Sequence, residues 1–173
     1  MKIIALAATS SSKSINKTLV SYAANLVENS NVELMDLNDY ELPLFSEDKE
    51  AELGQPERAK AFFDKLGSGD AIMISFAEHN GSYTAAYKNI FDWASRIDQK
   101  VFQNKPMILL SSSPGPGGAA SVLAAATGSA PYFAGDVKGS FKLPSFYDNF
   151  DMQANQLTNP ELLTELNSLV AAL

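Results

Sequence analysis

Hydroxyl, amide and glycine residues gather in three short segments of the sequence, and each segment follows an apolar run. Residues 9–16 (TSSSKSIN) combine five hydroxyls, an amide and one lysine at the start of a predicted helix. Free N–H groups and the dipole at a helix N-terminus bind phosphate. Residues 113–118 (SPGPGG) hold three glycines, which allow the backbone to approach a planar ligand closely. These residue types favour the binding of a phosphate-bearing ligand.

Each segment also has a purely structural interpretation. Residues 9–14 can be a serine-rich turn in which Ser14 caps the following helix. The Asn-Gly pair in residues 77–84 (AEHNGSYT) is a turn signal, and the glycines of residues 113–118 are compatible with a tight turn. Taken one at a time, the segments leave both interpretations open, and their convergence in the fold is what would favour the ligand.

Composition excludes several kinds of chemistry. There are 20 acidic and 13 basic residues, a net charge of −7, which disfavours binding to nucleic acid or to an anionic membrane. There is no cysteine, so disulfides, thiolate metal sites and cysteine nucleophiles are excluded. With His79 as the one histidine, a multi-histidine zinc site is excluded too, and no metal site is expected. Redox or transfer chemistry would therefore need a bound cofactor.

Hydrolase and nucleotide-loop motifs are missing from the sequence. A serine triad would have to use His79 as its base, and there is no GxSxG nucleophile elbow. The phosphate-binding motifs GxxxxGK[ST] and GxGxxG are also absent. We therefore nominate no catalytic residue, and keep His79 only as a candidate proton donor.

The elements that position these segments alternate between strands and helices. Continuous apolar runs at 2–8, 71–76 and 106–110 predict buried strands, with further strands at 31–36 and 137–143. Helical spacing of apolar residues predicts helices at 15–27, 55–66, 86–97, 119–127 and 162–170, with Gly128 ending the fourth. Residues 37–55 are predicted to be a loop, and 144–159 is the least regular stretch.

This alternation predicts an α/β fold with a parallel sheet and helices on both faces. Five strands suit the flavodoxin-like order 2-1-3-4-5, in one domain over residues 1–173. No apolar run approaches the ~20 residues of a membrane helix, and the opening MKIIALAA is typical of a first strand rather than a signal peptide. The segments after the first, third and fourth strands then meet at the switch point, where such sheets bind ligands.

The second and third segments carry a family resemblance. Residues 77–82 (AEHNGS) are similar to the P-E-Y-N-x-S motif of the NADPH-dependent FMN reductase family, which includes quinone, azo and chromate reductases. Residues 88–96 (KNIFDWASR) resemble its K-N-x-x-D-W-x-S-R motif, and residues 113–118 its S-P-G-x-G-G motif. In the first segment, Thr9 and Ser11 stand where the family's usual G-S-x-R has Ser and Arg.

The resemblance implies a set of cofactor-binding residues. The FMN phosphate would be held by Thr9, Ser11, Ser14, Ile15 and Asn16. The isoalloxazine ring would be lined by Glu78, His79, Asn80, Gly81 and Ser82, partly through backbone groups. Its other side would be rimmed by Ser113, Pro114 and Gly115. Trp93 is expected in the core or at a subunit contact, and Lys88 and Arg96 at a dimer seam or in solvent.

The resemblance implies an FMN-dependent NAD(P)H oxidoreductase that passes hydride from NADPH or NADH to the flavin and then to a quinone, flavin or similar small-molecule acceptor. It also implies a cytoplasmic homodimer or homotetramer. Two alternatives stay open: a flavodoxin-type electron carrier, and a flavin-binding module without turnover. The T/S-x-T-G-x-T phosphate loop of flavodoxins is absent, which favours the reductase over the carrier.

Overall fold

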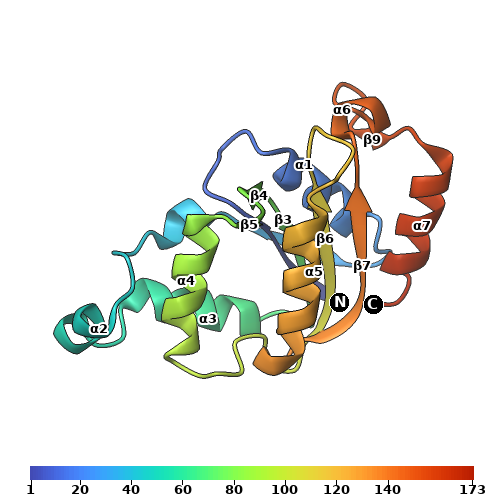
Figure 1. The fold of residues 1–173 in the computed structure, drawn as a ribbon. Helices are drawn as coiled ribbons and strands as arrows, with labels where there is room; N and C mark the ends of the chain where they lie inside the picture. The colour runs from blue at the N-terminus through green and yellow to red at the C-terminus, as the bar shows by residue number, and fades with distance from the viewer.

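A five-stranded parallel sheet forms the centre of the computed structural model, which describes residues 1–173. Its strands are β1 (Lys2–Ala8), β2 (Asn31–Met35), β3 (Ala71–Phe76), β6 (Pro106–Ser112) and β7 (Asp136–Leu143). They lie in the order β2-β1-β3-β6-β7, and every neighbouring pair is parallel (Figure 1). Counting only these strands, the order is the predicted 2-1-3-4-5, so the flavodoxin-like prediction is confirmed.

Helices cover both faces of the sheet, as predicted (Figure 1). One face packs against α1 (Ile15–Asn25) and α7 (Pro160–Val170), and the other against α3 (Glu57–Gly67), α4 (Ala85–Ser95) and α5 (Ala120–Ser129). Alternate residues of β1 enter the two cores: Ile3 faces α1 and α7, and Ile4 faces α3 and α4. Because both faces are covered, β1 and β3 are buried along almost their whole length and consist mainly of apolar residues. No helix is both long and apolar enough to cross a membrane.

The prediction of a loop over residues 37–55 was wrong. This stretch contains a 3-10 helix, η1 (Leu37–Tyr40), and a helix, α2 (Glu47–Leu53). Ser46 caps α2, its Oγ accepting a hydrogen bond from the Lys49 N–H at 3.1 Å. No residue of α2 is buried, and the helix lies out beyond α3 and α4 (Figure 1). Apolar periodicity is a signal of burial, so a helix without a buried face carries none.

The prediction that Gly128 ends a helix was also wrong. Helix α5 continues through Gly128 to Ser129 and then tightens into the 3-10 helix η2 (Ala130–Phe133). The residue that leaves the helical region is Ala134, with φ 59°, whereas Gly128 keeps a negative φ. A glycine ends a helix when it adopts a positive φ. Here the residue with a positive φ is Ala134, six residues after Gly128.

Residues 144–159 form short elements that pack on the sheet. They are α6 (Phe146–Asn149) and the two strands of a hairpin, β8 (Phe150–Asp151) and β9 (Gln156–Leu157). Phe146 and Phe150 are buried in the core under α1 and α7, their rings stacked at 5.0 Å. This packing holds the segment that follows β7 against the carboxyl ends of the strands.

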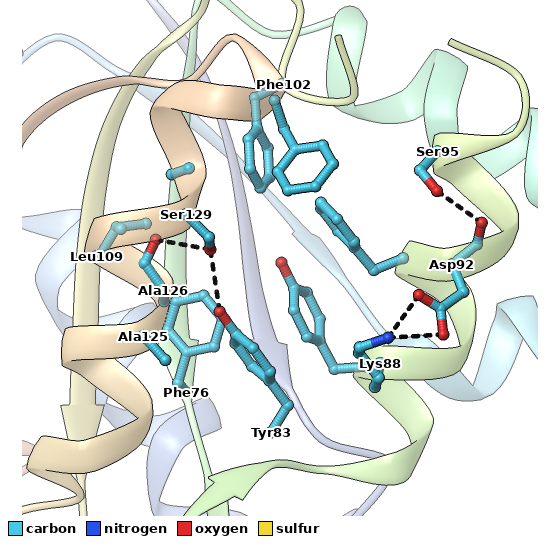
Figure 2. A pocket seen from close by; sticks show the side chains of 14 residues that line it. Phe76, Tyr83, Lys88, Asp92, Ser95, Phe102, Leu109, Ala125, Ala126 and Ser129 are labelled. Carbon is cyan, nitrogen blue, oxygen red and sulfur yellow. Dashed lines mark hydrogen bonds and ion pairs between the residues drawn. The ribbon is translucent and has the colours of Figure 1, made fainter. Parts of the chain in front are cut away.

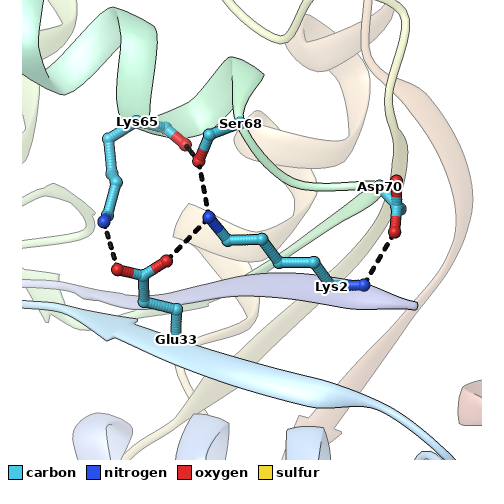
Figure 3. A network of polar contacts seen from close by, with 5 residues as sticks. All are labelled: Lys2, Glu33, Lys65, Ser68 and Asp70. Atoms are coloured by element: carbon cyan, nitrogen blue, oxygen red, sulfur yellow. Dashed lines mark hydrogen bonds and ion pairs between the residues drawn. The ribbon is translucent and has the colours of Figure 1, made fainter.

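Charged side chains tie the opposite, amino-terminal edge of the sheet together (Figure 3). Glu33 on β2 forms ion pairs with Lys2 on β1, at 2.9 Å, and with Lys65 on α3. The hydrogen bond from Lys65, followed by that from Lys2, holds the pKa of the Glu33 carboxyl below its usual value. These side chains are about one third exposed, so water screens them and each pair contributes at most about 1 kcal/mol to stability.

Candidate functional site

The three polar segments meet at the carboxyl ends of β1, β3 and β6 and surround a hollow of about 280 Å³. Its lining includes nine of the predicted residues: Thr9, Ser11, Ser14, Ile15, Asn16, Glu78, His79, Ser113 and Pro114. Four others lie outside the lining: Asn80, Gly81, Ser82 and Gly115. The hollow also takes in Lys13, Ala77, Ser112 and Tyr147, which the prediction of the site did not include.

The first segment presents unpaired backbone donors at the start of α1. Ser14 is the N-cap, and its Oγ accepts from the Asn16 N–H at 3.2 Å. The Ser11 N–H donates to Thr9 Oγ1 at 3.2 Å, which folds the turn back on itself. The backbone N–H groups of residues 12–15 donate to no acceptor in the chain. Four adjacent free N–H groups at a helix N-terminus are an arrangement typical of anion-binding sites.

Asn16 lines the hollow, but its side-chain amide is hydrogen-bonded within the protein. Its Nδ2 donates to the Ser112 carbonyl at 3.1 Å, and its Oδ1 accepts from the Ser112 N–H at 2.9 Å and from Ser75 Oγ at 2.7 Å. The residue is only 2% exposed. Asn16 therefore joins the first turn of α1 to the ends of β3 and β6, and the expected contact with phosphate stays a prediction.

Two lysines lie near the free N–H groups, and only one has an unpaired charge. Lys17 donates to Asp36 at 2.7 Å, and this hydrogen bond holds the pKa of the Asp36 carboxyl below its usual value. Lys13 lines the hollow, is exposed and forms no ion pair. Lys13 is thus the cation available to an anion bound at residues 12–15.

The second segment is a hairpin formed by β4 (Glu78–His79) and β5 (Ser82–Tyr83). Asn80 and Gly81 make its turn with φ values of 53° and 79°, the pair of positive angles that a two-residue hairpin turn requires. Glu78 Oε2 accepts from the Val122 N–H at 2.9 Å, in the first turn of α5. This bond docks the hairpin on α5 and leaves Glu78 and His79 beside the hollow while the turn extends beyond it.

The third segment is pinned to the chain that follows β7. The Ser145 N–H donates to the Gly115 carbonyl at 2.9 Å, and the Phe146 N–H to the Ser113 carbonyl at 3.1 Å. These bonds bring Tyr147, which is 63% exposed, to the edge of the hollow. Nothing in the local sequence signals this residue, because it reaches the site through pairing between segments thirty residues apart.

The family-like helix residues have structural partners within the chain. Trp93 is fully buried, and its Nε1 donates to the Pro43 carbonyl at 2.8 Å, so the core prediction is confirmed. Lys88 pairs with Asp92 one turn along α4 at 2.7 Å. Arg96 pairs with Glu50 of α2 at 2.9 Å and fastens α2 to α4. These contacts leave the hollow as the place where functional groups converge.

Comparison with known proteins gives relatives of the same kind. The chain is 32% identical over 116 residues to an NAD(P)H-dependent FMN reductase of Pseudomonas aeruginosa, covering 66% of this chain and 61% of that protein. It is 31% identical over 125 residues to an NADPH:quinone oxidoreductase of Arabidopsis thaliana, covering 70% and 62%. The chain thus spans about three fifths of the length of these two relatives.

Structure comparison and a family model cover more of the chain. A flavoenzyme NAD(P)H:(acceptor) oxidoreductase of Paracoccus denitrificans shares the fold, with a TM-score of 0.77 at 23% identity, over 99% of this chain and 93% of the other. The model of the NADPH-dependent FMN reductase family matches residues 1–143. Because this match runs from β1 to the end of β7 and includes all three segments around the hollow, the chain belongs to the NADPH-dependent FMN reductase family.

Proposed function

We propose that this chain is an FMN-dependent NAD(P)H oxidoreductase that reduces a quinone, a flavin or a similar small acceptor. The observation that carries the proposal is the run of free N–H groups at residues 12–15, with Lys13 beside them. A dianionic phosphate monoester satisfies these donors, and FMN carries such a group on a planar ring system. The names of the relatives support the nicotinamide and quinone parts of the proposal.

The residues of the hollow fit the cofactor. The N–H groups of residues 12–15, Ser11 and Lys13 would hold the phosphate. The backbone of the 78–82 hairpin and the loop at residues 113–115 would flank the ring, with His79 and Tyr147 at its edge. A β-carbon at Gly115 or Gly117 would meet no atom within 4 Å, so this side leaves room for a planar co-substrate.

FMN, when bound, accepts a hydride from a nicotinamide and supplies the electrons to a second substrate. The protein's part is to bind and orient the cofactor and to leave one side of it accessible to the substrates. Glu78 is held by the Val122 N–H and Asn16 by Ser112, so both are fixed by contacts within the fold. The arrangement contains no paired acid and base, and we assign no catalytic residue. Exposed His79 at the hollow stays a candidate donor of a proton to a reduced quinone.

The assembly that we propose is a homodimer, or a tetramer built from it. The support comes from α2, which has no buried residue in the single chain, and from Leu44 and Leu53, which are 78% and 47% exposed. Exposed apolar side chains at the end of a projecting helix and in the segment before it are well suited to a subunit contact. Light scattering should give at least twice the monomer mass. A fully active monomer at micromolar concentration would remove this part of the proposal, and a cytoplasmic location stays a prediction for fractionation.

Two experiments test the function. First, calorimetric titration should show that FMN binds at least tenfold more tightly than riboflavin, and that Ser14→Asp, which sets a carboxylate beside the free N–H groups, abolishes only the FMN preference. Equal affinities for the two flavins would refute the phosphate assignment.

Second, NADPH or NADH should bleach the flavin absorbance of FMN-loaded protein under anaerobic conditions, and a quinone should restore it. No bleaching by either nicotinamide would favour the electron carrier, and no binding of FMN would favour loss of the flavin.

A further inference from the structure

A second cavity, of about 290 Å³, lies on the sheet face covered by α4 and α5, and shares no residue with the hollow (Figure 2). Aromatic rings supply much of its wall: Phe76, Tyr83, Tyr87, Phe91, Phe102 and Phe133. Facing them on α5 are the small side chains of Ala125 and Ala126 (Figure 2). Alanines opposite a shell of rings leave a space whose walls suit a flat apolar molecule.

One polar group in this cavity has no partner. Tyr87 is 4% exposed, and its hydroxyl takes part in no hydrogen bond of the chain, whereas the hydroxyl of Tyr83 lies 3.2 Å from Ser129 Oγ. The fully enclosed polar side-chain atoms without a partner belong only to Gln55 and Thr127, so the Tyr87 hydroxyl opens onto the cavity. The hydroxyl therefore has a free donor inside the cavity, and a ligand oxygen placed there would accept a hydrogen bond from it.

The charges around the cavity indicate an uncharged ligand. Lys88 and Asp92, both part of the lining, neutralise each other with Nζ–O distances of 2.7 and 2.9 Å (Figure 2). Burial raises the pKa of the Tyr87 hydroxyl, which therefore stays neutral and able to donate. A cavity of about 150 Å³ lined by apolar side chains binds benzene, so one of about 290 Å³ holds one or two fused rings.

We propose that this cavity is a binding site for a neutral, planar aromatic molecule of one or two rings whose hydroxyl or carbonyl oxygen accepts a hydrogen bond from Tyr87. The site goes beyond the proposed function and does not depend on it. Its walls adjoin the hollow through two shared elements. Tyr83 of the hairpin pairs with Glu78, which lines the hollow, and α5 carries both the alanine wall and the Val122 N–H that holds Glu78.

The test uses 2-naphthol as the probe and isothermal titration calorimetry on the protein alone and again in the presence of excess FMN. Wild type should bind one equivalent per chain in both cases. Ala125→Trp should abolish binding because the indole fills the mouth of the cavity, where Ala125 is exposed. Ala124→Trp is the matched control: Ala124 is also exposed on α5 but lies outside this lining, so its affinity should stay at the wild-type value.

Tyr87→Phe keeps the ring and removes only the unpaired hydroxyl, so it also covers the case in which a tryptophan variant fails to fold. It should weaken 2-naphthol roughly three- to tenfold, the effect of one neutral hydrogen bond. The proposal is overturned if wild type binds no 2-naphthol up to its solubility limit, if FMN displaces the probe, or if Ala125→Trp and Tyr87→Phe both bind with wild-type affinity. None of these readouts uses NAD(P)H, so their failure is distinct from failure of the proposed reductase activity.

Discussion

Asn16→Ala should destabilise the fold strongly. The substitution removes the three hydrogen bonds that Asn16 makes with Ser75 and Ser112, both of which are at most 2% exposed. Each bond contributes about 1 kcal/mol net, and a buried group left without a partner costs about 1–3 kcal/mol. Ser75 Oγ can rotate toward another acceptor, so the sum is about 3 kcal/mol. The free energy of unfolding of a domain is typically about 5–15 kcal/mol, so the variant is expected to fold.

Urea unfolding followed by the fluorescence of Trp93, the one tryptophan, measures this effect. The urea concentration at the midpoint of unfolding should fall, while the slope of the unfolding free energy against urea concentration is unchanged. The melting temperature should drop by about 6–12 °C. Asn25→Ala is the matched control, because Asn25 lies at the other end of α1, is exposed, and makes a single bond to the Ser21 carbonyl. Its effect should lie within about 0.5 kcal/mol of zero.

A double-mutant cycle separates the network from simple loss of volume. Ser75→Ala removes one bond to Asn16, so its effect should be smaller in the Asn16→Ala background, with a coupling energy of about 1 kcal/mol. If Asn16→Ala unfolds at the same urea concentration as Asn25→Ala, the buried network does not hold the first turn of α1 against the sheet. The free N–H groups of residues 12–15 would then owe their position to contacts other than those of Asn16.

Three further outcomes are expected. Lys13→Ala should weaken the binding of FMN but not of riboflavin, because Lys13 carries the unpaired positive charge of the hollow, and the loss of affinity should shrink as the salt concentration rises. An equal loss of affinity for both flavins would contradict this. Gly118→Ala should cost about 1–3 kcal/mol in thermal unfolding, because its φ is 59° and a β-carbon would lie 2.6 Å from Lys142 Cγ, whereas Gly117→Ala, with open space, should be close to neutral. The hydrogen bond from Lys17 lowers the pKa of Asp36, so this pair should add at most about 1 kcal/mol to the free energy of unfolding at pH values above the unfolded-state pKa of 3.8, and the addition should be lost as the pH falls below it. If the difference in unfolding free energy between wild type and Asp36→Asn is the same at pH 6 and pH 2.5, the assignment is contradicted.

The sequence by itself determined the sheet and the place of the site. Continuous apolar runs such as residues 71–76 are typical of strands covered on both sides, and their alternation with helical periods leaves few topologies. Because parallel strands end at one edge, the polar segments that follow β1, β3 and β6 had to meet there. These inferences need only local patterning and the geometry of a parallel sheet.

Tertiary structure alone decided how the individual side chains are used. Asn16 was predicted to touch a phosphate, and only the structure shows that its amide is hydrogen-bonded to Ser75 and Ser112, since buried polar groups are nearly always paired. Tyr147 enters the hollow because residues 145–146 pair with the glycine loop, a long-range contact that no local pattern reports. Helix α2 was not predicted because none of its residues is buried, and only a helix with a buried face shows apolar periodicity in its sequence.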